Sequence, residues 1–342
     1  MRIAMVAPVA MPVLPGEGDS IEQLVSLLTE ELVGRGHDVT LFATGDSVTR
    51  ADLVSCYDHG YREDEDLWDW QLPEAVNAAF AFERADNFDV IHSHTYHFAL
   101  PFSRFISTPS VHTYHVQLGP EAVRAFRLYP DAHLVAISEY QRSTLEGLED
   151  VTVIRHGIDT EAFPFGRANG GYLAFVGRMI PSKGADEAIR VARECALPLV
   201  MAGPATEWFD AEVRPQIDGR TVRYEGTVDA AARNELLAGA AAMLFPVSYP
   251  EPFGLVMVEA MACGTPVAAY GLGAVPEIID QGVGGFCVDP GRSLASAVTE
   301  AMELDRARVR ASALERFDFR RMVDDYERLY RRLAAEGPAP VR

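Results

Sequence analysis

The sequence predicts an α/β protein made of two doubly wound domains, each built on a parallel sheet. Short apolar segments alternate with helical patterns along nearly the whole chain, which is typical of parallel sheets with helices on both faces. The alternation restarts after a glycine-rich stretch at residues 166–171. The chain also has 342 residues, 48% of them hydrophobic, which is more than one compact domain usually holds.

In the first half of the chain, residues 3–7 are expected to form a buried strand. This apolar run resembles the start of a signal peptide, but prolines at positions 8, 12 and 15 interrupt it. Asp19 and Ser20 then precede a helix whose apolar residues recur at helical spacing, and residues 34–37 end it. Further strands are expected at residues 39–43, 90–92, 110–112, 134–137 and 151–154.

In the second half, the alternation gives strands at residues 172–176, 199–202, 242–245 and 266–269, and helices at 185–195, 231–240 and 255–263. We therefore predict a first domain over residues 1–165, a linker at 166–171 and a second domain over 172–312. Residues 313–336 are expected to form a final helix that crosses back to the first domain. The helix carries an apolar stripe that needs a partner, made of Phe319, Met322, Val323, Tyr326, Leu329, Tyr330 and Leu333.

The composition excludes several classes of partner. Thirty basic against fifty acidic residues give a formal charge of −20, which on average repels nucleic acids and anionic membranes. The longest apolar run, residues 236–247, is shorter than the about 20 residues that cross a bilayer. The four cysteines are far apart, which favours free thiols in a reducing cytosol over disulfides or a thiolate zinc site. We therefore expect a cytoplasmic protein without membrane insertion.

The loop after the strand at 172–176 has the features of a diphosphate site. Gly177 and Gly184 let backbone amides approach an anion, a helix begins directly after the loop, and Arg178 and Lys183 add positive charge. The alternative is a solvated loop with two ordinary cations. Of the thirty basic residues only Lys183 is a lysine, which favours a site where a compact ammonium matters.

Two glutamates follow the strand at 242–245. Glu251 lies before a helix, and Glu259 lies inside it among apolar residues, where an unpaired carboxylate is costly. Glu259 is expected to accept hydrogen bonds from a specific group such as vicinal hydroxyls, and the backbone amides of residues 253–255 form an anion-facing helix start. The alternative is a capping Glu251 and a structurally paired Glu259.

Five of the nine histidines fall between residues 92 and 115. His92 and His94 alternate at one strand end, and His112 and His115 bracket the next. A zinc site is one interpretation, but no fourth ligand can be placed, and sugar binding or proton transfer is favoured.

An acidic stretch, residues 63–70, contains Asp64-Glu65-Asp66, a formal match to the DxD signature of metal-dependent sugar transferases. No strand precedes it, so we interpret it as a solvated loop. Trp68 and Trp70 in this stretch are compatible with stacking on a sugar and with anchoring the loop.

The chain resembles the family 4 retaining glycosyltransferases of the GT-B fold along nearly its whole length. The matching stretches are residues 35–39, 153–159 and 177–184, the E-x7-E pattern from Glu251 to Glu259, and residues 259–267 and 273–277. The resemblance implies two Rossmann-like domains whose sheets face a cleft. Within the family the chain looks like an enzyme of oligosaccharide-antibiotic biosynthesis.

The resemblance also implies a role for each matching residue. Arg178 and Lys183 would hold the diphosphate of a UDP-type donor in place of a metal ion, so neither a metal nor another cofactor is expected. Glu259 would bind the ribose hydroxyls and Glu251 would face the donor sugar. The backbone amides of Phe253, Gly254, Leu255 and Val256 would contact sugar and phosphate.

In the first domain, Thr113-Tyr114-His115 matches the family's T-x-H, which makes His115 the catalytic histidine of the cleft and His112 the second candidate.

One departure concerns the Gly-Gly pair that the family commonly has before its first helix. Asp19 and Ser20 stand there in this chain, with Gly16 and Gly18 just upstream. Either Gly16 and Gly18 approach the phosphate instead, or this loop serves the acceptor.

The function that follows is retaining transfer of a sugar from a nucleoside diphosphate to a soluble small-molecule acceptor. The alternatives are a nucleotide-sugar epimerase on the same scaffold and a non-catalytic nucleotide-sugar binding protein. The arginine–lysine loop and the E-x7-E pattern favour the transferase over both, although a fold by itself never proves chemistry.

Overall fold

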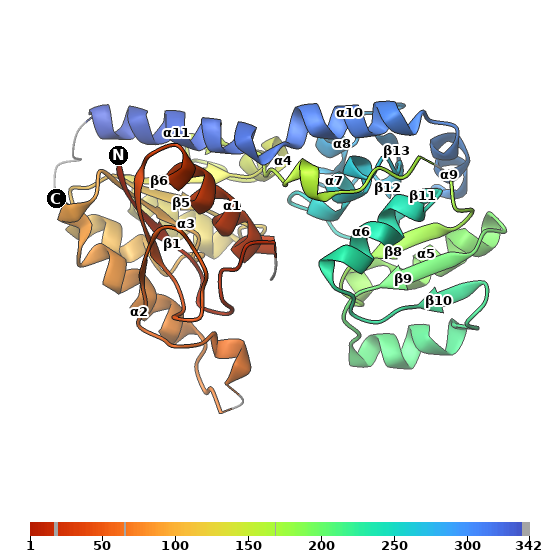
Figure 1. The fold of residues 1–342 in the computed structure, drawn as a ribbon, viewed down its shortest axis with the longest axis horizontal. Helices are drawn as coiled ribbons and strands as arrows, with labels where there is room; N and C mark the ends of the chain where they lie inside the picture. The colour runs from red at the N-terminus through yellow and green to blue at the C-terminus, as the bar shows by residue number, and fades with distance from the viewer. Residues whose placement is uncertain (17–19, 65, 168, 337–342) are drawn as a thin grey trace. The chain divides into compact units, whose positions relative to one another are not determined.

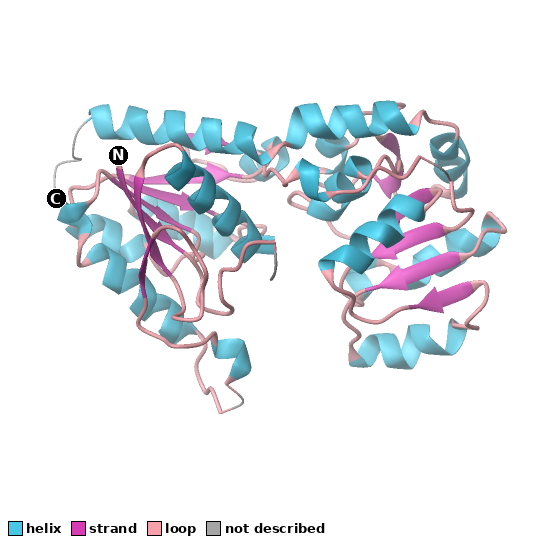
Figure 2. Cartoon of the chain, in the orientation of Figure 1, coloured by secondary structure: helices cyan, strands magenta, loops and turns pink. Residues whose placement is uncertain are grey.

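A computed structural model describes residues 1–16, 20–64, 66–167 and 169–336, and the chain forms two compact units. Unit 1 contains Met1–Gly157 together with the segment that begins at Phe319, and unit 2 contains Ile158–Asp318. In each unit, helices cover both faces of one parallel sheet (Figures 1 and 2). The predicted fold class, two Rossmann-like α/β domains, is confirmed.

Unit 1 has seven strands, ordered β3-β2-β1-β4-β5-β6-β7 across the sheet. Their bounds are β1 (Arg2–Val6), β2 (Asp38–Phe42), β3 (Asp52–Val54), β4 (Val90–Ser93), β5 (Ser110–Thr113), β6 (Ala132–Ala136) and β7 (Val151–Val153). The helices are α1 (Ser20–Gly34), α2 (Gln71–Phe82), α3 (Pro120–Leu128), α4 (Glu139–Ser143) and α11 (Phe319–Glu336).

Unit 2 has six strands, ordered β10-β9-β8-β11-β12-β13. They are β8 (Leu173–Val176), β9 (Leu199–Ala202), β10 (Val222–Tyr224), β11 (Ala242–Phe245), β12 (Val267–Tyr270) and β13 (Gly285–Val288). Its helices are α5 (Ala185–Glu194), α6 (Ala230–Gly239), α7 (Leu255–Ala262), α8 (Val275–Ile278), α9 (Ala295–Met302) and α10 (Arg306–Phe317).

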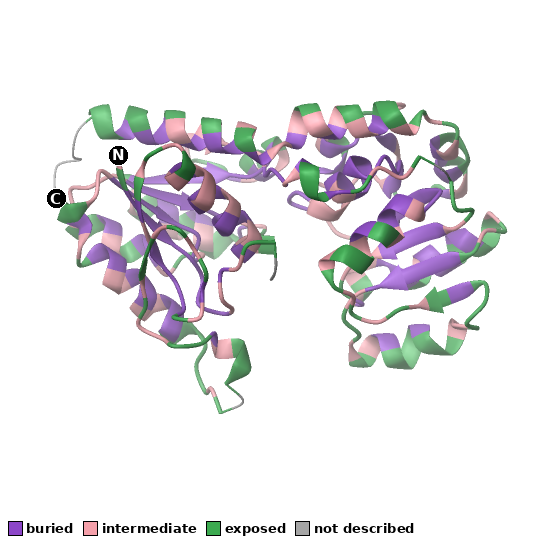
Figure 3. Cartoon of the chain, in the orientation of Figure 1, coloured by how far each residue is buried: buried purple, intermediate pink, exposed green. Residues whose placement is uncertain are grey.

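Both sheets reverse their strand order in the middle, between β1 and β4 in unit 1 and between β8 and β11 in unit 2. In open parallel sheets, ligands bind outside the carboxyl ends of the strands at such a reversal. The central strands are buried on both faces, as Figure 3 shows in purple. They therefore form rigid platforms, and the loops that follow them carry the chemistry.

The glycine-rich stretch predicted as a linker packs inside unit 2. The backbone N–H of Gly166 donates to the carbonyl of Cys263 at 3.0 Å, and that of Gly170 donates to the carbonyl of Gly239 at 2.9 Å. A Cβ at position 166 would lie 1.8 Å from the carbonyl oxygen of Ala238, so only glycine fits. The glycines allow close packing, and the change of unit lies earlier, between Gly157 and Ile158.

The segment predicted as one helix over residues 313–336 is two helices. Asp318 has extended backbone between α10 and α11, and its carboxylate accepts a hydrogen bond from the Thr160 hydroxyl at 2.7 Å. The helix α11 belongs to unit 1, where it packs on α1 and β4. All seven residues of its apolar stripe are buried.

No helix in the part of the chain that the structure describes is both long and apolar enough to span a membrane.

Candidate functional site

The candidate site of unit 2 lies where β8 and β11 end side by side. The loop after β8 and the loop after β11 are joined by a hydrogen bond from the backbone N–H of Ser248 to the carbonyl of Ser182, at 3.0 Å. Gly184 has a φ of 77°, and a Cβ there would lie 2.3 Å from the carbonyl oxygen of Pro246. The two loops approach this closely because residue 184 is glycine.

Lys183 and Glu251 form the centre of the site, as their positions after neighbouring strands predict. The ammonium of Lys183 donates to Oε2 of Glu251 at 2.7 Å and to the hydroxyl of Tyr249 at 2.6 Å. The Tyr249 hydroxyl also donates to Oε2 of Glu251. The side chains of Lys183 and Glu251 are 17% and 9% exposed, so this is a largely desolvated ion pair.

Tyr249 is a site residue that the sequence did not reveal. Burial and the neighbouring Glu251 carboxylate raise the pKa of its hydroxyl, and the positive charge of Arg178 acts in the opposite direction. Arg178 is exposed, and its side chain makes no hydrogen bond or ion pair with the residues that the structure describes. The Tyr249 hydroxyl thus contacts Lys183 and Glu251 directly and is within the electrostatic influence of Arg178. A tyrosine two residues before a glutamate carries no signal that would have identified it.

Glu251 is also held through its backbone. Its carbonyl accepts a hydrogen bond from the N–H of Ala274 at 2.8 Å. Ala274 lies in the stretch at residues 273–277 that resembles the glycosyltransferases, directly before α8. The resemblance therefore includes a segment that fixes the position of a site residue.

The start of α7 adds backbone donors to the site. Gly254 is its N-terminal cap, and Leu255 and Val256 are its first two residues. The first N–H groups of a helix have no acceptor within it, so they are available to an anion. Phe253 is buried and packs edge-to-face on Phe317 with ring centroids 6.1 Å apart, which anchors this end of the helix.

Glu259 has a protein partner that the sequence did not reveal. Its side chain is 12% exposed, and one carboxylate oxygen lies 3.6 Å from Nε of Arg233 on α6. Burial raises the pKa of Glu259, and Arg233 opposes that shift. At 3.6 Å the contact is an ion pair without a short hydrogen bond, so the carboxylate keeps acceptor capacity for hydroxyl groups.

In unit 1, three of the predicted histidines come together near the carboxyl ends of β4 and β5. Nδ1 of His94 lies 2.9 Å from Nε2 of His115, and Nδ1 of His115 lies 3.3 Å from Nε2 of His156. The ring of His92 packs at a tilt against that of His94, with centroids 4.0 Å apart, and is hydrogen-bonded to Tyr330 at 2.5 Å. His156 lies in a stretch that resembles the family, but its place in this row could not be predicted.

Burial favours the neutral form of each imidazole in the row. Burial lowers the pKa of His115 to about 3 and also lowers the pKa values of His94 and His156 well below the ordinary range. A neutral imidazole has one N–H and one lone pair, so the hydrogen bonds of the row run in one direction. Both ring nitrogens of His115 face other rings, and a ligand hydroxyl reaches one only by replacing a neighbour.

His112 does not join this row. It lies on the opposite face of β5, where Nε2 is 3.0 Å from the Ser103 hydroxyl and 3.2 Å from that of Ser110. Burial lowers the pKa of His112 to about 3. Because side chains alternate across a strand, residues 112 and 113 face opposite ways, and Thr113 instead contacts His92 at 2.8 Å.

The remaining predicted residues lie outside these clusters. Gly16 has a left-handed φ of 75°, and Gly18 and Asp19 fall outside the described residues. Trp68 is 99% exposed, whereas Trp70 packs on Tyr61 and Phe98 with ring centroids 6.2 and 5.8 Å away. Among the described residues, no group of three or more histidine, cysteine or acidic side chains is arranged to hold a metal ion.

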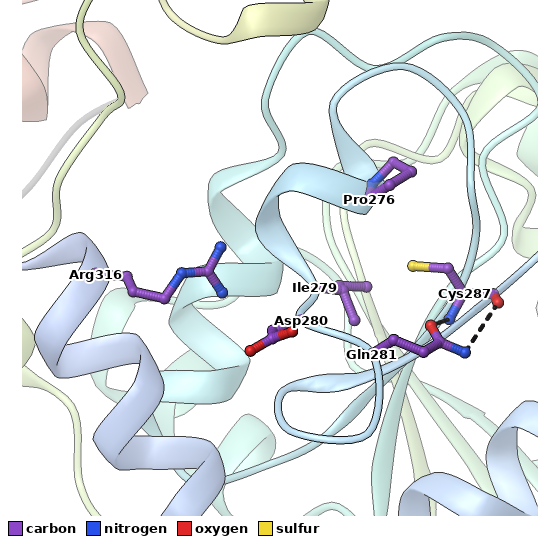
Figure 4. A pocket seen from close by; sticks show the side chains of 6 residues that line it. All are labelled: Pro276, Ile279, Asp280, Gln281, Cys287 and Arg316. Atoms are coloured by element: carbon purple, nitrogen blue, oxygen red, sulfur yellow. Dashed lines mark hydrogen bonds between the residues drawn. The ribbon is translucent and has the colours of Figure 1, made fainter.

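A separate cavity of about 470 Å³ lies in unit 2 (Figure 4). It is lined by Pro276, Ile279, Asp280, Gln281, Cys287 and Arg316, and none of the predicted site residues of unit 2 is among them. The amide of Gln281 bonds both backbone groups of Cys287, and burial raises the pKa of that thiol to about 12. Burial therefore favours the protonated thiol, the less nucleophilic form.

Comparison with known families identifies the chain. Residues 21–162 match the model of "Glycosyltransferase Family 4", and residues 159–316 match that of "Glycosyl transferases group 1". With its two Rossmann-like units, the protein is a glycosyltransferase of the GT-B fold. The match of residues 21–162 to the family 4 model agrees with the resemblance that the sequence motifs carry.

Individual relatives extend over most of the chain. A glycogen synthase of Mycobacterium tuberculosis is 27% identical over 96% of this chain and 91% of its own. A D-inositol 3-phosphate glycosyltransferase of Frankia alni is 29% identical, over 81% of this chain and 85% of its own.

Solved structures agree with this assignment. AviGT4, a glycosyltransferase involved in avilamycin A biosynthesis, is 27% identical with a TM-score of 0.75, covering 98% of this chain and 99% of its own. Anabaena HepE in complex with UDP and glucose is 22% identical with a TM-score of 0.71, covering 98% of this chain and all of its own, and shares the fold.

Proposed function

We propose that the protein transfers a sugar from a UDP-type nucleoside diphosphate to a soluble small-molecule acceptor with retention of configuration. The observation that carries this proposal is the largely desolvated pair of Lys183 and Glu251 at the strand-order reversal of unit 2. The pair places a cation for phosphate beside a carboxylate for a sugar. The UDP bound to HepE and the glycosyltransferase names of the relatives support this choice of donor.

In this proposal Arg178 and Lys183 hold the diphosphate and neutralise the charge that develops on it as it leaves. The first N–H groups of α7 add hydrogen bonds to the same anion. Two full positive charges and a helix start supply the neutralisation that a metal ion provides in other transferases, so activity is expected without an added metal. Turnover that disappears with EDTA and returns with Mg²⁺ would refute that part.

The carboxylates divide the remaining donor contacts. Glu259 accepts the ribose hydroxyls, and Glu251 faces the sugar ring, where positive charge develops as the bond to the diphosphate lengthens. The acceptor attacks on the face that the diphosphate leaves, and a donor phosphate oxygen takes its proton, which retains the anomeric configuration. His115 of unit 1 is the proposed catalytic histidine, a role that requires a ligand hydroxyl to replace His94 or His156 at one of its ring nitrogens.

The test is UDP binding and sugar transfer in Lys183→Ala, Lys183→Arg and a control, Arg292→Ala, which removes an exposed positive charge elsewhere in unit 2. Loss of charged hydrogen bonds of roughly 1.5–3 kcal/mol predicts ten- to hundredfold weaker UDP binding by Lys183→Ala. The Arg variant keeps the charge but not the compact geometry, and should recover binding only in part. Equal binding by all four proteins would refute the proposal.

The epimerase and binding-protein alternatives have their own readout. An epimerase converts the nucleotide sugar with no acceptor present, and a binding protein converts nothing. The anomeric configuration of the product, read by proton NMR, separates retention from inversion. A role in oligosaccharide-antibiotic biosynthesis is the biological setting we favour, supported by the likeness to AviGT4.

A further inference from the structure

The chemistry described above gives no role to Tyr249, although its hydroxyl lies at the centre of the candidate site of unit 2. That hydroxyl accepts a hydrogen bond from the ammonium of Lys183 at 2.6 Å and donates one to Oε2 of Glu251. The Lys183 ammonium donates to the same oxygen at 2.7 Å. In the part of the chain that the structure describes, no hydrogen bond reaches the other oxygen of Glu251, Oε1. Oε1 is therefore the oxygen that is left for a sugar hydroxyl.

The local sequence holds the phenol and the carboxylate on one side of the chain. Tyr249 and Glu251 each precede a proline, and a residue before proline favours extended backbone. Side chains two residues apart on an extended backbone point to the same side. Glu251 also forms an isolated β-bridge with Gly273, where a Cβ would lie 2.3 Å from the carbonyl oxygen of Glu251. The backbone therefore supports the hydrogen bond between the two side chains.

Lys183 must serve two anions when a diphosphate binds. Its ammonium has three N–H groups, and two of them are used by Glu251 and Tyr249 in this structure. A diphosphate therefore draws contacts and positive charge away from Glu251. The side chain of Glu251 is 9% exposed, so water replaces little of what the carboxylate loses.

The Tyr249 hydroxyl is suited to stay with the carboxylate at that point. Burial and the neighbouring Glu251 raise the pKa of the hydroxyl, so it keeps the proton that it donates. The hydroxyl is also uncharged, and a diphosphate attracts it less strongly than it attracts an ammonium. Its hydrogen bond to Oε2 can therefore persist as Lys183 turns to the phosphate.

We propose that Tyr249 is a positioning residue of the transfer reaction. Its hydroxyl holds Oε2 of Glu251 when the diphosphate takes Lys183, and this keeps Oε1 directed at the donor sugar. The inference rests on the proposed function, which supplies the diphosphate and the sugar. Lys183 exchanges one anion for another during donor binding, whereas Tyr249 keeps the same partner throughout and acts only through Glu251.

The experiment is a double-mutant cycle with UDP as the probe, measured by calorimetry. The four proteins are the wild type, Tyr249→Phe, Glu251→Gln and the double variant. Phenylalanine keeps the ring and removes the hydroxyl, and glutamine keeps the size of the glutamate and removes its charge. The matched control is Tyr172→Phe, which removes a hydroxyl that donates to the carbonyl of Leu236 at 2.7 Å. Tyr172 directly precedes β8, at the opposite end of that strand from the Lys183 loop.

With Glu251 in place, Tyr249→Phe should weaken UDP binding about tenfold, because the bound state then contains a carboxylate that has lost a charged hydrogen bond. In the Glu251→Gln background the same change should not weaken UDP binding, because no buried charge is left to hold. A tyrosine with a merely structural role would not be rescued in this way. Tyr172→Phe should stay within about twofold of the wild type. Tyr249→Leu repeats the cycle if far-UV circular dichroism shows that Tyr249→Phe does not fold.

Two results would overturn the proposal. A similar loss of UDP affinity in both backgrounds would show that Tyr249 packs the site or contacts UDP directly. Unchanged or tighter UDP binding by Tyr249→Phe with Glu251 in place would show that Tyr249 only competes for Lys183.

The failure of the proposed function gives a different result. If the wild type binds no UDP, or Lys183→Ala binds it as tightly as the wild type does, the donor assignment fails and the role of Tyr249 fails with it. If UDP binding depends on Lys183 and the cycle shows no coupling between Tyr249 and Glu251, only the role of Tyr249 fails.

Discussion

Glu251 and Glu259 have the same side chain in different surroundings. Glu251 is bound by the Lys183 ammonium and the Tyr249 hydroxyl, whereas Glu259 has one ion pair, with Arg233 at 3.6 Å. A group that acts in the ground state and the transition state alike affects binding, and a group that acts mainly in the transition state affects turnover. The two glutamates should therefore fail in different ways.

In the proposed function, Glu259→Gln should weaken UDP binding ten- to hundredfold, because it would remove roughly 1.5–3 kcal/mol of charged hydrogen bonds to the ribose. Glu251→Gln should lower turnover while UDP affinity holds or rises, since the variant leaves Lys183 without its counter-charge. Calorimetry with UDP and initial rates at saturating donor give the two parameters. Equal losses of both parameters in both variants would falsify this division of roles.

Glu74 predicts a pH dependence of stability. Burial raises its pKa from the ordinary 4.5 to about 7, and the nearby charge of Glu22 adds to the shift. Below pH 4.5 the Glu74 carboxyl is protonated in both the folded and the unfolded chain, so its contribution to the free energy of unfolding is fully present. As pH rises from 4.5 to 7 the unfolded chain releases the proton first, so the free energy of unfolding falls, by about 3 kcal/mol in total.

Glu74→Gln removes this titration. The free energies of unfolding of this variant and of the wild type are measured in urea at pH 5 and at pH 8. Relative to the wild type, the variant should be more stable at pH 8 than at pH 5. A difference between the two proteins that stays constant over this range would show that Glu74 is ionised throughout.

At the scale of elements, α11 is fixed to the sheet of unit 1 through hydrogen bonds as well as apolar packing. The Tyr330 hydroxyl bonds Nδ1 of His92 at 2.5 Å, and the Tyr326 hydroxyl bonds that of Thr113 at 2.8 Å. On its other side, the Arg35 guanidinium contacts Asp324 and Glu327 of this helix at 2.6 and 3.0 Å. Helix α11 is therefore a structural part of the unit that contains the imidazole row.

Tyr330→Phe should destabilise the protein by about 1–3 kcal/mol, because it leaves a buried ring nitrogen of His92 without a partner. Tyr129→Phe is the matched control: that hydroxyl has no hydrogen bond among the described residues, and its loss should cost at most about 0.5 kcal/mol. Urea unfolding followed by far-UV circular dichroism measures both. Equal stabilities of the two variants would contradict a role for the Tyr330 bond.

The strands that sequence periodicity missed share a physical cause. The strands β3, β10 and β13 are three or four residues long and lie at sheet edges, where part of each strand is exposed and the apolar signal is weak. The glycines at 166–171 were interpreted as a linker because glycine marks flexible segments as well as tight packing. Central strands such as β9 and β11 were predicted to the residue, because both of their faces are buried.

For the molecule as a whole, the two-unit fold could be predicted from the sequence. So could the proximity of the charged side chains that follow adjacent strands of unit 2. Arg178, Lys183 and Glu251 could be placed together because the carboxyl ends of parallel strands meet at one edge. Tyr249, Arg233 and His156 could not, because their contacts depend on side-chain directions across separate elements. Sequence periodicity indicates which edge of a sheet holds a residue, and packing decides which atoms touch.

Because Lys183 is the only lysine in the sequence, a label on lysine amines reports on the proposed donor site alone. Reductive methylation with ¹³C-formaldehyde labels only amines, and the chain printed above has two kinds: the α-amino group of Met1 and the ε-amine of Lys183. The Lys183 amine lies between a carboxylate and a phenol, so its methyl resonance is expected apart from that of Met1. UDP should shift one signal and leave the other in place, and a lysine signal unmoved at saturating UDP would argue against phosphate contact. The ¹³C-methyl signal of Lys183 then gives donor occupancy directly, without assignment of the signals of the other 341 residues.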